Sequence, residues 1–212
     1  MAPLDSLVHR VRPPAGDPGG AIVLLHGRGT DEHDLFPLID FLDPERRLIG
    51  FTPRAPLQLP PGGNHWYVSR EIGYPDPDTF RSSFDLVAGW LGELAEATGV
   101  PWEKTVLGGF SQGAVMSYAL GLGQDRPSPS RLIALSGFIP RVPGFELDLA
   151  SRAGLPVAIG HGSYDPVISV EFSREARALL EQAGLEVVYR ETPMAHGVDP
   201  GYLAELADWL SP

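Results

Sequence analysis

Continuous apolar runs alternate along the chain with stretches whose apolar positions recur every three or four residues. The apolar runs at 21–25, 105–110, 132–135 and 156–160 are typical of strands that are covered on both faces of a sheet. Helical spacing is clearest at 78–98 and 169–183, where the apolar residues fall on one face. This alternation predicts an α/β fold with a mainly parallel central sheet and helices on both of its faces.

Weaker patterns complete the predicted order of elements. Further strands are expected at 6–12, as an edge strand, and at 48–51 and 185–189, with further helices at 34–42, 112–120 and 201–210. The proline-rich segment 53–61 is expected to be loop. No internal repeat or low-complexity linker divides the 212 residues, so the chain 1–212 is expected to form a single domain.

The sequence Gly-Phe-Ser-Gln-Gly at 109–113 lies where the strand 105–110 meets the helix that follows it. A G-x-S-x-G motif between a strand and a helix is typical of a nucleophilic serine, here Ser111, held in a sharp turn. Gly109 and Gly113 lack the Cβ atoms that would collide in such a turn. The motif alone also fits an ordinary strand–helix turn, so other parts of the chain must decide between the two interpretations.

Two more reactive side chains follow predicted strands. Asp165 comes after the strand 156–160, and His196 lies between the last strand and the last helix. Reactive groups of parallel sheets gather at the carboxyl ends of the strands, and the order Ser111, Asp165, His196 is that of one large class of serine hydrolases. These three residues are the predicted nucleophile, acid and base. The alternatives are an ordinary turn aspartate and a solvated loop histidine.

Other carboxylates and histidines compete for these roles. Asp148 lies in an amphipathic stretch where a solvated position is the simpler interpretation, and Asp199 is expected to cap the last helix. His161 is expected to shape the loop that holds Asp165. Three further histidines lie in loop or edge contexts without a paired acid, namely His9, His33 and His65.

A glycine-rich loop, His26-Gly27-Arg28-Gly29, follows the strand 21–25. The backbone N–H groups of Arg28 and Gln112 are candidates for an oxyanion hole. The alternative is a turn shaped only by strand–helix geometry. The loop lacks the spacing of phosphate-binding and dinucleotide-binding motifs. The Arg28 side chain is either solvated or placed to meet a carboxylate or phosphate of a substrate.

Five short motifs in one order and spacing carry a resemblance to a known family. The segments 25–32, 109–113, 135–140, 161–165 and 195–197 resemble the phospholipase/carboxylesterase family of α/β-hydrolases, which includes acyl-protein thioesterases. The resemblance implies a compact, cap-less α/β-hydrolase with the triad Ser111, Asp165 and His196 and an oxyanion hole formed by the amides of Arg28 and Gln112. It also implies action on carboxylic esters or thioesters without a cofactor or metal. Arg28, Thr30 and the segment 66–68 look more like the bacterial carboxylesterase branch than the eukaryotic thioesterases.

Apolar residues in the predicted loops could line a substrate pocket. The candidates are Trp66, Tyr67, Ile72, Phe138 and Ile139, each of which also fits ordinary loop packing. The interval from Gly137 to Leu155 is too short for a folded lid domain, so a shallow, open pocket is expected.

Charge and composition exclude several classes of binding partner and of chemical site. The net charge of −11 argues against nucleic acid and anionic membranes, and the absence of cysteine excludes disulfides, thiolate metal sites and a cysteine nucleophile. The first residues have no signal-peptide core, and no segment is apolar enough to span a bilayer, so a cytoplasmic protein without stable membrane insertion is expected. The oligomeric state stays open, a homodimer included.

The leading functional hypothesis is a serine carboxylesterase that cleaves small-molecule esters of small to medium acyl chain through an acyl-enzyme. A lysophospholipase or acyl thioesterase is the alternative, and it would need a longer apolar groove. A catalytically silent hydrolase fold that serves as a binding module is the third hypothesis. Such a protein would normally have lost a member of the triad, whereas all three residues are present here.

Overall fold

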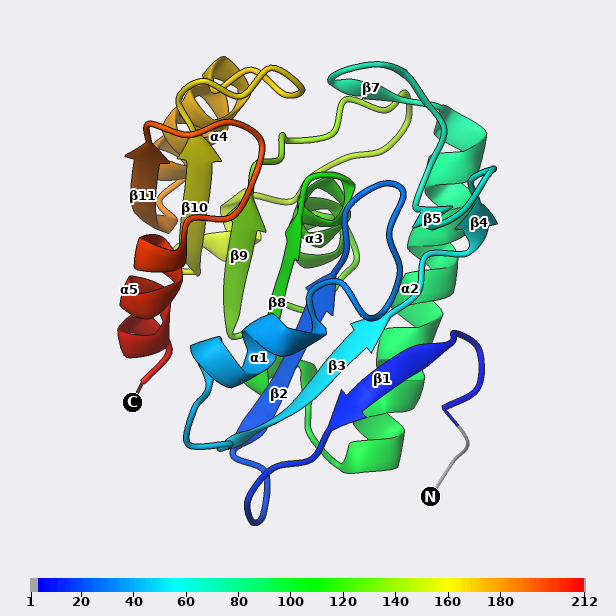
Figure 1. Cartoon of the computed structure of the whole chain (residues 1–212), viewed down its shortest axis with the longest axis vertical. Helices are drawn as coiled ribbons and strands as arrows, with labels where there is room; N and C mark the ends of the chain where they lie inside the picture. Colours follow the sequence, from blue (N-terminus) through cyan, green and yellow to red (C-terminus); the bar gives the residue numbers. More distant parts are fainter. Residues whose placement is uncertain (1–3, 212) are drawn as a thin grey trace.

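A computed structural model describes residues 4–211, and a seven-stranded sheet crosses its centre (Figure 1). The strand order is β1-β3-β2-β8-β9-β10-β11, and every pairing is parallel except that of β1 with β3. The strands are β1 (His9–Arg12), β2 (Gly20–Leu25), β3 (Leu48–Pro53), β8 (Thr105–Phe110), β9 (Arg131–Leu135), β10 (Pro156–Gly162) and β11 (Glu186–Thr192). The predicted parallel sheet is therefore confirmed, and the predicted edge strand is its one antiparallel member.

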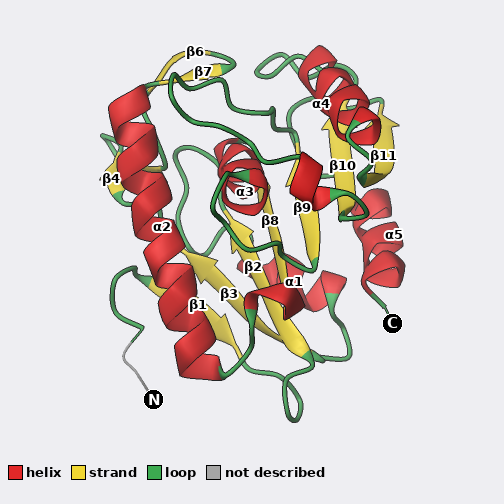
Figure 2. Ribbon diagram, turned by 180° about the vertical axis from the view of Figure 1, so that it is seen from behind, coloured by secondary structure: helices red, strands yellow, loops and turns green. Residues whose placement is uncertain are grey.

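Helices cover both faces of the sheet. They are α1 (Phe36–Leu42), α2 (Pro77–Thr98), α3 (Gln112–Leu122), α4 (Glu171–Gln182) and α5 (Pro200–Leu210), with short 3₁₀ turns η1 (Trp102–Lys104) and η2 (Ala150–Arg152). Helices α1 and α5 lie on one face (Figure 1), and α2, α3 and α4 lie on the other (Figure 2). The α/β-hydrolase architecture inferred from the sequence is confirmed.

Alternate residues of the five inner strands, β3, β2, β8, β9 and β10, belong to two separate hydrophobic cores. In β2, Ala21, Val23 and Leu25 belong to the core under α2, α3 and α4. Ile22 and Leu24 belong to the core under α1 and α5. Successive side chains of a strand point to opposite faces, so a strand buried on both sides must be apolar throughout. This is the physical reason for the continuous apolar runs.

Helix α3 lies at the centre of the molecule, between the sheet and α2 (Figure 2). All of its residues are buried. Gly121 lets the helix approach β9 closely, because a Cβ there would lie 2.6 Å from the Leu132 side chain. A helix that begins directly after β8 and is packed on all sides holds its first residue in a fixed position.

Two small hairpins were not predicted. β4 (Leu57–Gln58) pairs with β5 (Asn64–His65), and β6 (Ser69–Glu71) pairs with β7 (Tyr74–Pro75). The segment expected as loop at 53–61 thus contains the short strand β4, a correction of that expectation. Strands this short produce no periodic apolar pattern.

Several predicted elements differ from the observed ones only at their ends. The first strand begins at His9 rather than at residue 6, and α4 begins at Glu171 rather than at 169. Within residues 4–211, none of the helices has the length and apolar character needed to cross a lipid bilayer.

Candidate active site

Ser111 occupies the sharp turn between β8 and α3. Its backbone has φ 55° and ψ −119°, a conformation that is strained for a residue with a side chain. The turn fits because its neighbours are glycines. A Cβ on Gly113 would lie 1.8 Å from the carbonyl oxygen of Leu25, and one on Gly109 would lie 2.4 Å from the Gly113 backbone. The sequence expectation of a tight glycine-dependent turn at 109–113 agrees with this geometry.

His196 lies in the loop between β11 and α5, and Asp165 lies in the loop after β10. The two side chains meet, with His196 Nδ1 donating to Asp165 Oδ2 at 2.6 Å. The neutral ring then carries its lone pair on Nε2, the nitrogen that is free to accept a proton. The ring also packs against Phe110 at 4.7 Å between centroids, which fixes the imidazole beside the residue that precedes Ser111.

The Asp165 carboxylate is buried and fully hydrogen-bonded. Oδ1 accepts from the amides of Val167 (2.8 Å) and Ile168 (2.9 Å), while Oδ2 accepts from His196 and lies 3.2 Å from His161 Nε2. Burial alone would raise the pKa of Asp165, but the hydrogen bonds from His196 and the two amides lower it below its usual value. The group is therefore an anion that stays ionised at neutral pH.

His161 supports this carboxylate, as the sequence suggested. Its Nε2 donates to the carbonyl oxygen of Ile168 at 2.9 Å and faces Asp165, so Nε2 carries the proton. Its Nδ1 then accepts from the hydroxyl of Ser173 on α4. Burial lowers the pKa of His161, and the ring is neutral. Ser173, which the sequence gave no reason to select, thus takes part in fixing the loop that holds Asp165.

The loops that carry Asp165 and His196 are joined through their backbones. Tyr164 N donates to Met194 O at 3.0 Å, and Ser163 N donates to Thr192 O at 2.8 Å. Gly162 permits this contact, because a Cβ there would lie 2.3 Å from the Ala195 carbonyl oxygen. On the other side, the Ser136 hydroxyl donates to Gly197 O at 3.3 Å. His196 is therefore held by contacts with both neighbouring strand ends.

The glycine-rich loop after β2 is held on both sides of Arg28. Before Arg28, the buried His26 ring accepts from Ala55 N at 3.0 Å through Nε2 and contacts Gly27 O through Nδ1. After it, Gly29 N donates to Asn64 O at 2.8 Å, in β5. Burial lowers the pKa of His26, which keeps the ring neutral in this position. Arg28 itself is exposed.

Gln112 has a second role that the motif did not reveal. Its side-chain Oε1 accepts from Trp66 N at 3.1 Å, and its Nε2 donates to Tyr67 O at 3.0 Å. The indole of Trp66 donates to His26 O at 2.8 Å. The first residue of α3 therefore ties together the segment 66–67 and the loop after β2. A helix's first N–H groups have no partner within the helix, so the Gln112 amide stays available to a ligand.

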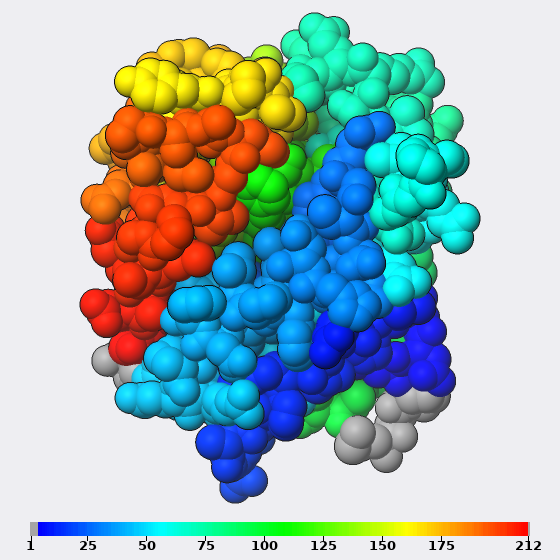
Figure 3. All heavy atoms as spheres, viewed as in Figure 1, coloured from blue at the N-terminus to red at the C-terminus, as the bar shows by residue number. Residues whose placement is uncertain are grey.

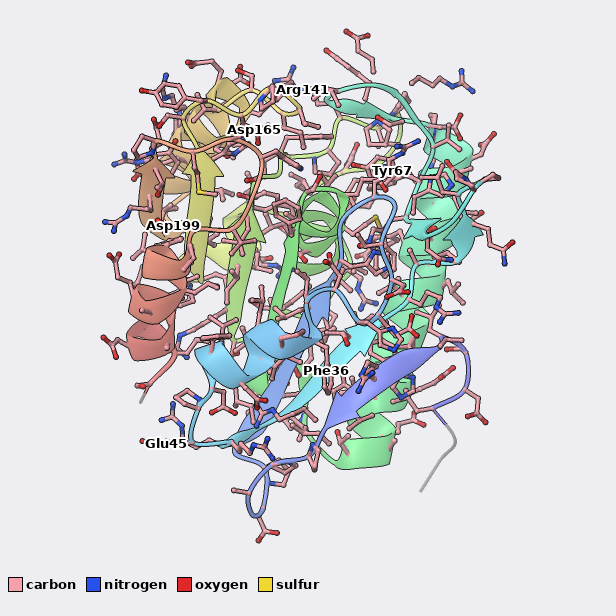
Figure 4. All side chains as sticks on the ribbon, viewed as in Figure 1. Phe36, Glu45, Tyr67, Arg141, Asp165 and Asp199 are labelled. Atoms are coloured by element: carbon pink, nitrogen blue, oxygen red, sulfur yellow. The ribbon has the colours of Figure 1, made fainter. Side chains whose placement is uncertain are left out.

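A pocket of about 320 Å³ brings the candidate residues together. Its lining comes from the segments after β2, β8, β9, β10 and β11 and from the segment 67–72, and it consists of Arg28, Tyr67, Ser69, Ile72, Ser111, Gln112, Phe138, Val167, Ile168 and His196. In Figure 3 the surface is hollowed between the orange loop after β11 and the blue loop after β2, and green atoms form the floor. Figure 4 shows Asp165 and Tyr67 on opposite sides of the start of α3.

The predicted pocket residues divide into two groups. Tyr67, Ile72 and Phe138 line this pocket, together with Ser69, Val167 and Ile168, which the sequence did not single out. The structure does not bring the other two candidates there. Trp66 is wholly buried in the core, and Ile139 lines a separate hollow beside Phe172. Trp66 supports the pocket from behind through its hydrogen bonds.

The competing acids and histidines lie outside the pocket. Asp199 caps α5 by accepting from Gly201 N at 2.9 Å, and Asp148 accepts from Ser151 N at 3.2 Å. One expectation was wrong, because His33 does have a paired acid, Asp31 at 3.1 Å. Asp31, Glu32 and His33 also place three potential metal ligands within 4.8 Å. The Glu32 carboxylate is already bound by Arg54 at 2.5 and 2.6 Å, so this cluster is explained by an ion pair.

The two buried neutral histidines predict how stability depends on pH. The pKa of His26 and of His161 is lowered from 6.5, so the unfolded chain binds more protons than the folded one as the pH falls below that value. The free energy of unfolding is therefore unaffected by these two groups above about pH 6.5. Below that pH it falls by up to about 1.4 kcal/mol per pH unit for each histidine. We expect the urea midpoint to be flat from about pH 7 to 8 and to fall below about 6.5.

Substitution of His161 separates this effect from general acid sensitivity. His161→Gln should lower the midpoint at neutral pH and make its decline with acid shallower than in the original protein. The exposed His33, replaced in His33→Gln, provides the control and should give the original slope. An unchanged slope in His161→Gln would contradict the assignment.

The sequence profile of one family, described as Phospholipase/Carboxylesterase, matches residues 8–212. The chain belongs to this family. Proteins of similar sequence include acyl-protein thioesterase 1 of Candida albicans, 28% identical over 217 residues, which cover 90% of each chain. Another is the putative hydrolase MhqD of Bacillus subtilis, 30% identical over 172 residues, which cover 80% of this chain and 81% of that one.

Solved structures of similar proteins agree with the fold. The crystal structure of esterase PE8 is 25% identical, with a TM-score of 0.81 over 96% of this chain and 97% of the other. The carboxylesterase of Bacillus cereus is 24% identical, with a TM-score of 0.82 over 96% and 92% of the two chains. The phospholipase/carboxylesterase fold thus extends over nearly the whole chain, and the family is one of hydrolases.

Proposed function

We propose that this hydrolase is a serine carboxylesterase with Ser111, Asp165 and His196 as its catalytic triad. One observation carries the proposal. The pocket that Ser111 lines is also lined by His196, whose Nδ1 is fixed by the Asp165 carboxylate. The strained backbone at Ser111 adds support, because strain of this kind persists where the surrounding structure enforces it, often at active sites.

In the proposed first step, Ser111 Oγ attacks the carbonyl carbon of the ester while His196 Nε2 takes the hydroxyl proton. The Asp165 carboxylate holds the tautomer in which Nε2 can accept and stabilises the imidazolium that forms. Because Asp165 has a lowered pKa, it remains charged and supplies this stabilisation throughout.

The tetrahedral intermediate bears a negative oxygen, which we assign to the backbone N–H groups of Arg28 and Gln112. Such a donor is worth about 3 kcal/mol of transition-state stabilisation in known hydrolases. His196 then gives its proton to the leaving alcohol, which departs and leaves Ser111 acylated. Water attacks the acyl-enzyme in the second half, with His196 again acting as base, and the acid product is released. No cofactor enters these steps.

The lining of the pocket bears on substrate size. Ile72, Phe138 and Val167 give it apolar walls, and its volume of about 320 Å³ accommodates a small to medium acyl chain. A thioesterase activity is the second candidate, favoured by relatives that are named acyl-protein thioesterases. The two differ in leaving group and not in the roles of the residues.

A chain-length series tests this proposal. 4-Nitrophenyl esters from acetate to palmitate, with butanoyl-CoA and palmitoyl-CoA alongside, should give the highest kcat/KM for acyl chains of about four to eight carbons. Highest activity on palmitoyl thioester would favour the second candidate. Failure to cleave any ester or thioester would contradict a hydrolytic function for the pocket.

A further inference from the structure

Arg28 is the one arginine among residues 4–211 whose side chain has no hydrogen bond, ion pair or aromatic contact. The others are engaged in several ways. Arg54 and Arg70 form close ion pairs, Arg152 bonds to carbonyl oxygens, and arginines such as Arg10 and Arg131 stack on rings. In a chain with 27 acidic and only 16 basic residues, a guanidinium with none of these three kinds of contact stands apart from the other arginines of the described residues.

The position of this cation makes it informative. Arg28 lines the pocket that contains Ser111 and His196, and none of the lining residues is acidic. The proposed catalytic anion, Asp165, has a buried side chain and takes its hydrogen bonds from donors other than Arg28. Arg28 is therefore the one arginine or lysine in the lining of the pocket, and no carboxylate of the lining offsets its charge, in a protein whose net charge is −11.

We infer that the physiological substrate is an ester or thioester that itself carries a carboxylate, which the Arg28 side chain binds. The inference rests on the proposed function and specifies its substrate class. A planar guanidinium suits a carboxylate because two N–H groups can donate to its two oxygens. The reaction remains hydrolysis, with water supplying the hydroxyl group of the new acid and the proton of the alcohol.

The same loop would then recognise the substrate twice. In the proposed mechanism the backbone N–H of Arg28 donates to the developing oxyanion, and the guanidinium of the same residue binds the carboxylate of the substrate. Both contacts come from one residue held between His26 and the Gly29–Asn64 hydrogen bond. A neutral ester uses the first contact only, so the charge decides selectivity between substrates.

Two matched pairs of esters test the inference, and the members of each pair differ by the charge and by one methyl group. For the acyl half, the pair is 4-nitrophenyl hydrogen adipate and its methyl ester. For the alcohol half, it is 4-carboxyphenyl butanoate and its methyl ester. The quantity measured is the ratio of kcat/KM for the anionic ester to that for the neutral one. Intrinsic reactivity cancels when this ratio is compared between protein variants.

The variants are Arg28→Gln, Arg28→Lys and a control of equal charge change, Lys104→Gln. Each keeps the peptide N–H at position 28, and any general effect on turnover cancels in the ratio. Lys104 is exposed in η1, at the opposite end of β8 from Ser111. We expect Arg28→Gln to lower the ratio about tenfold in at least one pair and Arg28→Lys to retain part of it. Lys104→Gln should leave it unchanged. Added salt should lower the ratio in the original protein and not in Arg28→Gln.

A ratio that changes less than about threefold in Arg28→Gln for both pairs would overturn the inference, as would an equal change in Lys104→Gln. The pair that responds identifies which half of the ester carries the charge. A negative result for Arg28 can be distinguished from a failure of the proposed esterase function. If neutral esters are cleaved and Ser111→Ala abolishes that cleavage, the triad stands even when Arg28 proves irrelevant to selectivity.

Discussion

Ser111→Ala is expected to lower kcat about 10⁵-fold or more and to abolish covalent labelling by a fluorophosphonate probe. Ser111 shares the pocket with His196, and the other hydroxyl groups in the described lining are those of Ser69 and Tyr67. The fold should survive, because alanine occupies the same strained backbone conformation and leaves a space no larger than one oxygen atom. Hydrolysis of 4-nitrophenyl butanoate, gel-based labelling and circular dichroism measure the three effects.

A buried serine in α3, the helix that Ser111 precedes, provides the matched control. Ser117 donates to Gly113 O at 2.9 Å and does not line the pocket. Ser117→Ala should therefore keep its labelling and most of its activity, with a modest loss of stability. Probe attached at another residue, or a Ser111→Ala protein that still turns over ester, would refute the assignment of the nucleophile.

Asp165→Asn is expected to lower kcat by about 10³- to 10⁴-fold through the wrong histidine tautomer. The geometry specifies how. The amide oxygen can replace Oδ1 as acceptor for Val167 and Ile168, which turns the NH₂ group toward His196 and His161. His196 must then accept at Nδ1 and carry its proton on Nε2, where it cannot act as base.

Asp199→Asn is the natural comparison, because Asp199 lies in the same loop as His196 but caps α5 and accepts from the Thr192 hydroxyl at 2.6 Å. Its effect on kcat should stay within a few-fold. A pH–rate profile and an unfolding curve for both proteins separate tautomer loss from loss of structure. Should Asp199→Asn be the more damaging change, the acid would have to be reassigned.

The elements that position Ser111, Asp165 and His196 could be predicted because buried parallel strands leave a strong signal. β8 matches its predicted bounds, 105–110. A G-x-S-x-G motif directly after such a strand then places its serine at the end of the sheet. The loops after β10 and β11 follow by the same argument, since parallel strands end at one edge.

The walls of the pocket could not be predicted in the same way. Tyr67 and Trp66 are neighbours in the sequence and both are buried in the core, yet only Tyr67 also lines the pocket. The Gln112 side chain, far along the chain, holds both of their backbones in place. The same holds for Ile139, which was predicted to line the pocket and lies in another hollow, and for Val167, which was not predicted and lines the pocket. Such contacts depend on how loops pack against each other, and no local pattern encodes them.

The complete burial of α3 determines whether this helix can unfold locally or only together with the whole domain. A surface helix can detach from its domain while the rest stays folded, but α3 can lose its contacts only when the sheet and α2 separate. Its amides should therefore exchange with solvent deuterium only through global unfolding, whereas those of the β6–β7 hairpin exchange through local openings. The residue at the start of α3 thus belongs to the most protected part of the chain, and the walls around it to a less protected part. Substrate range can then change by substitutions in the hairpin without loosening the turn that holds Ser111.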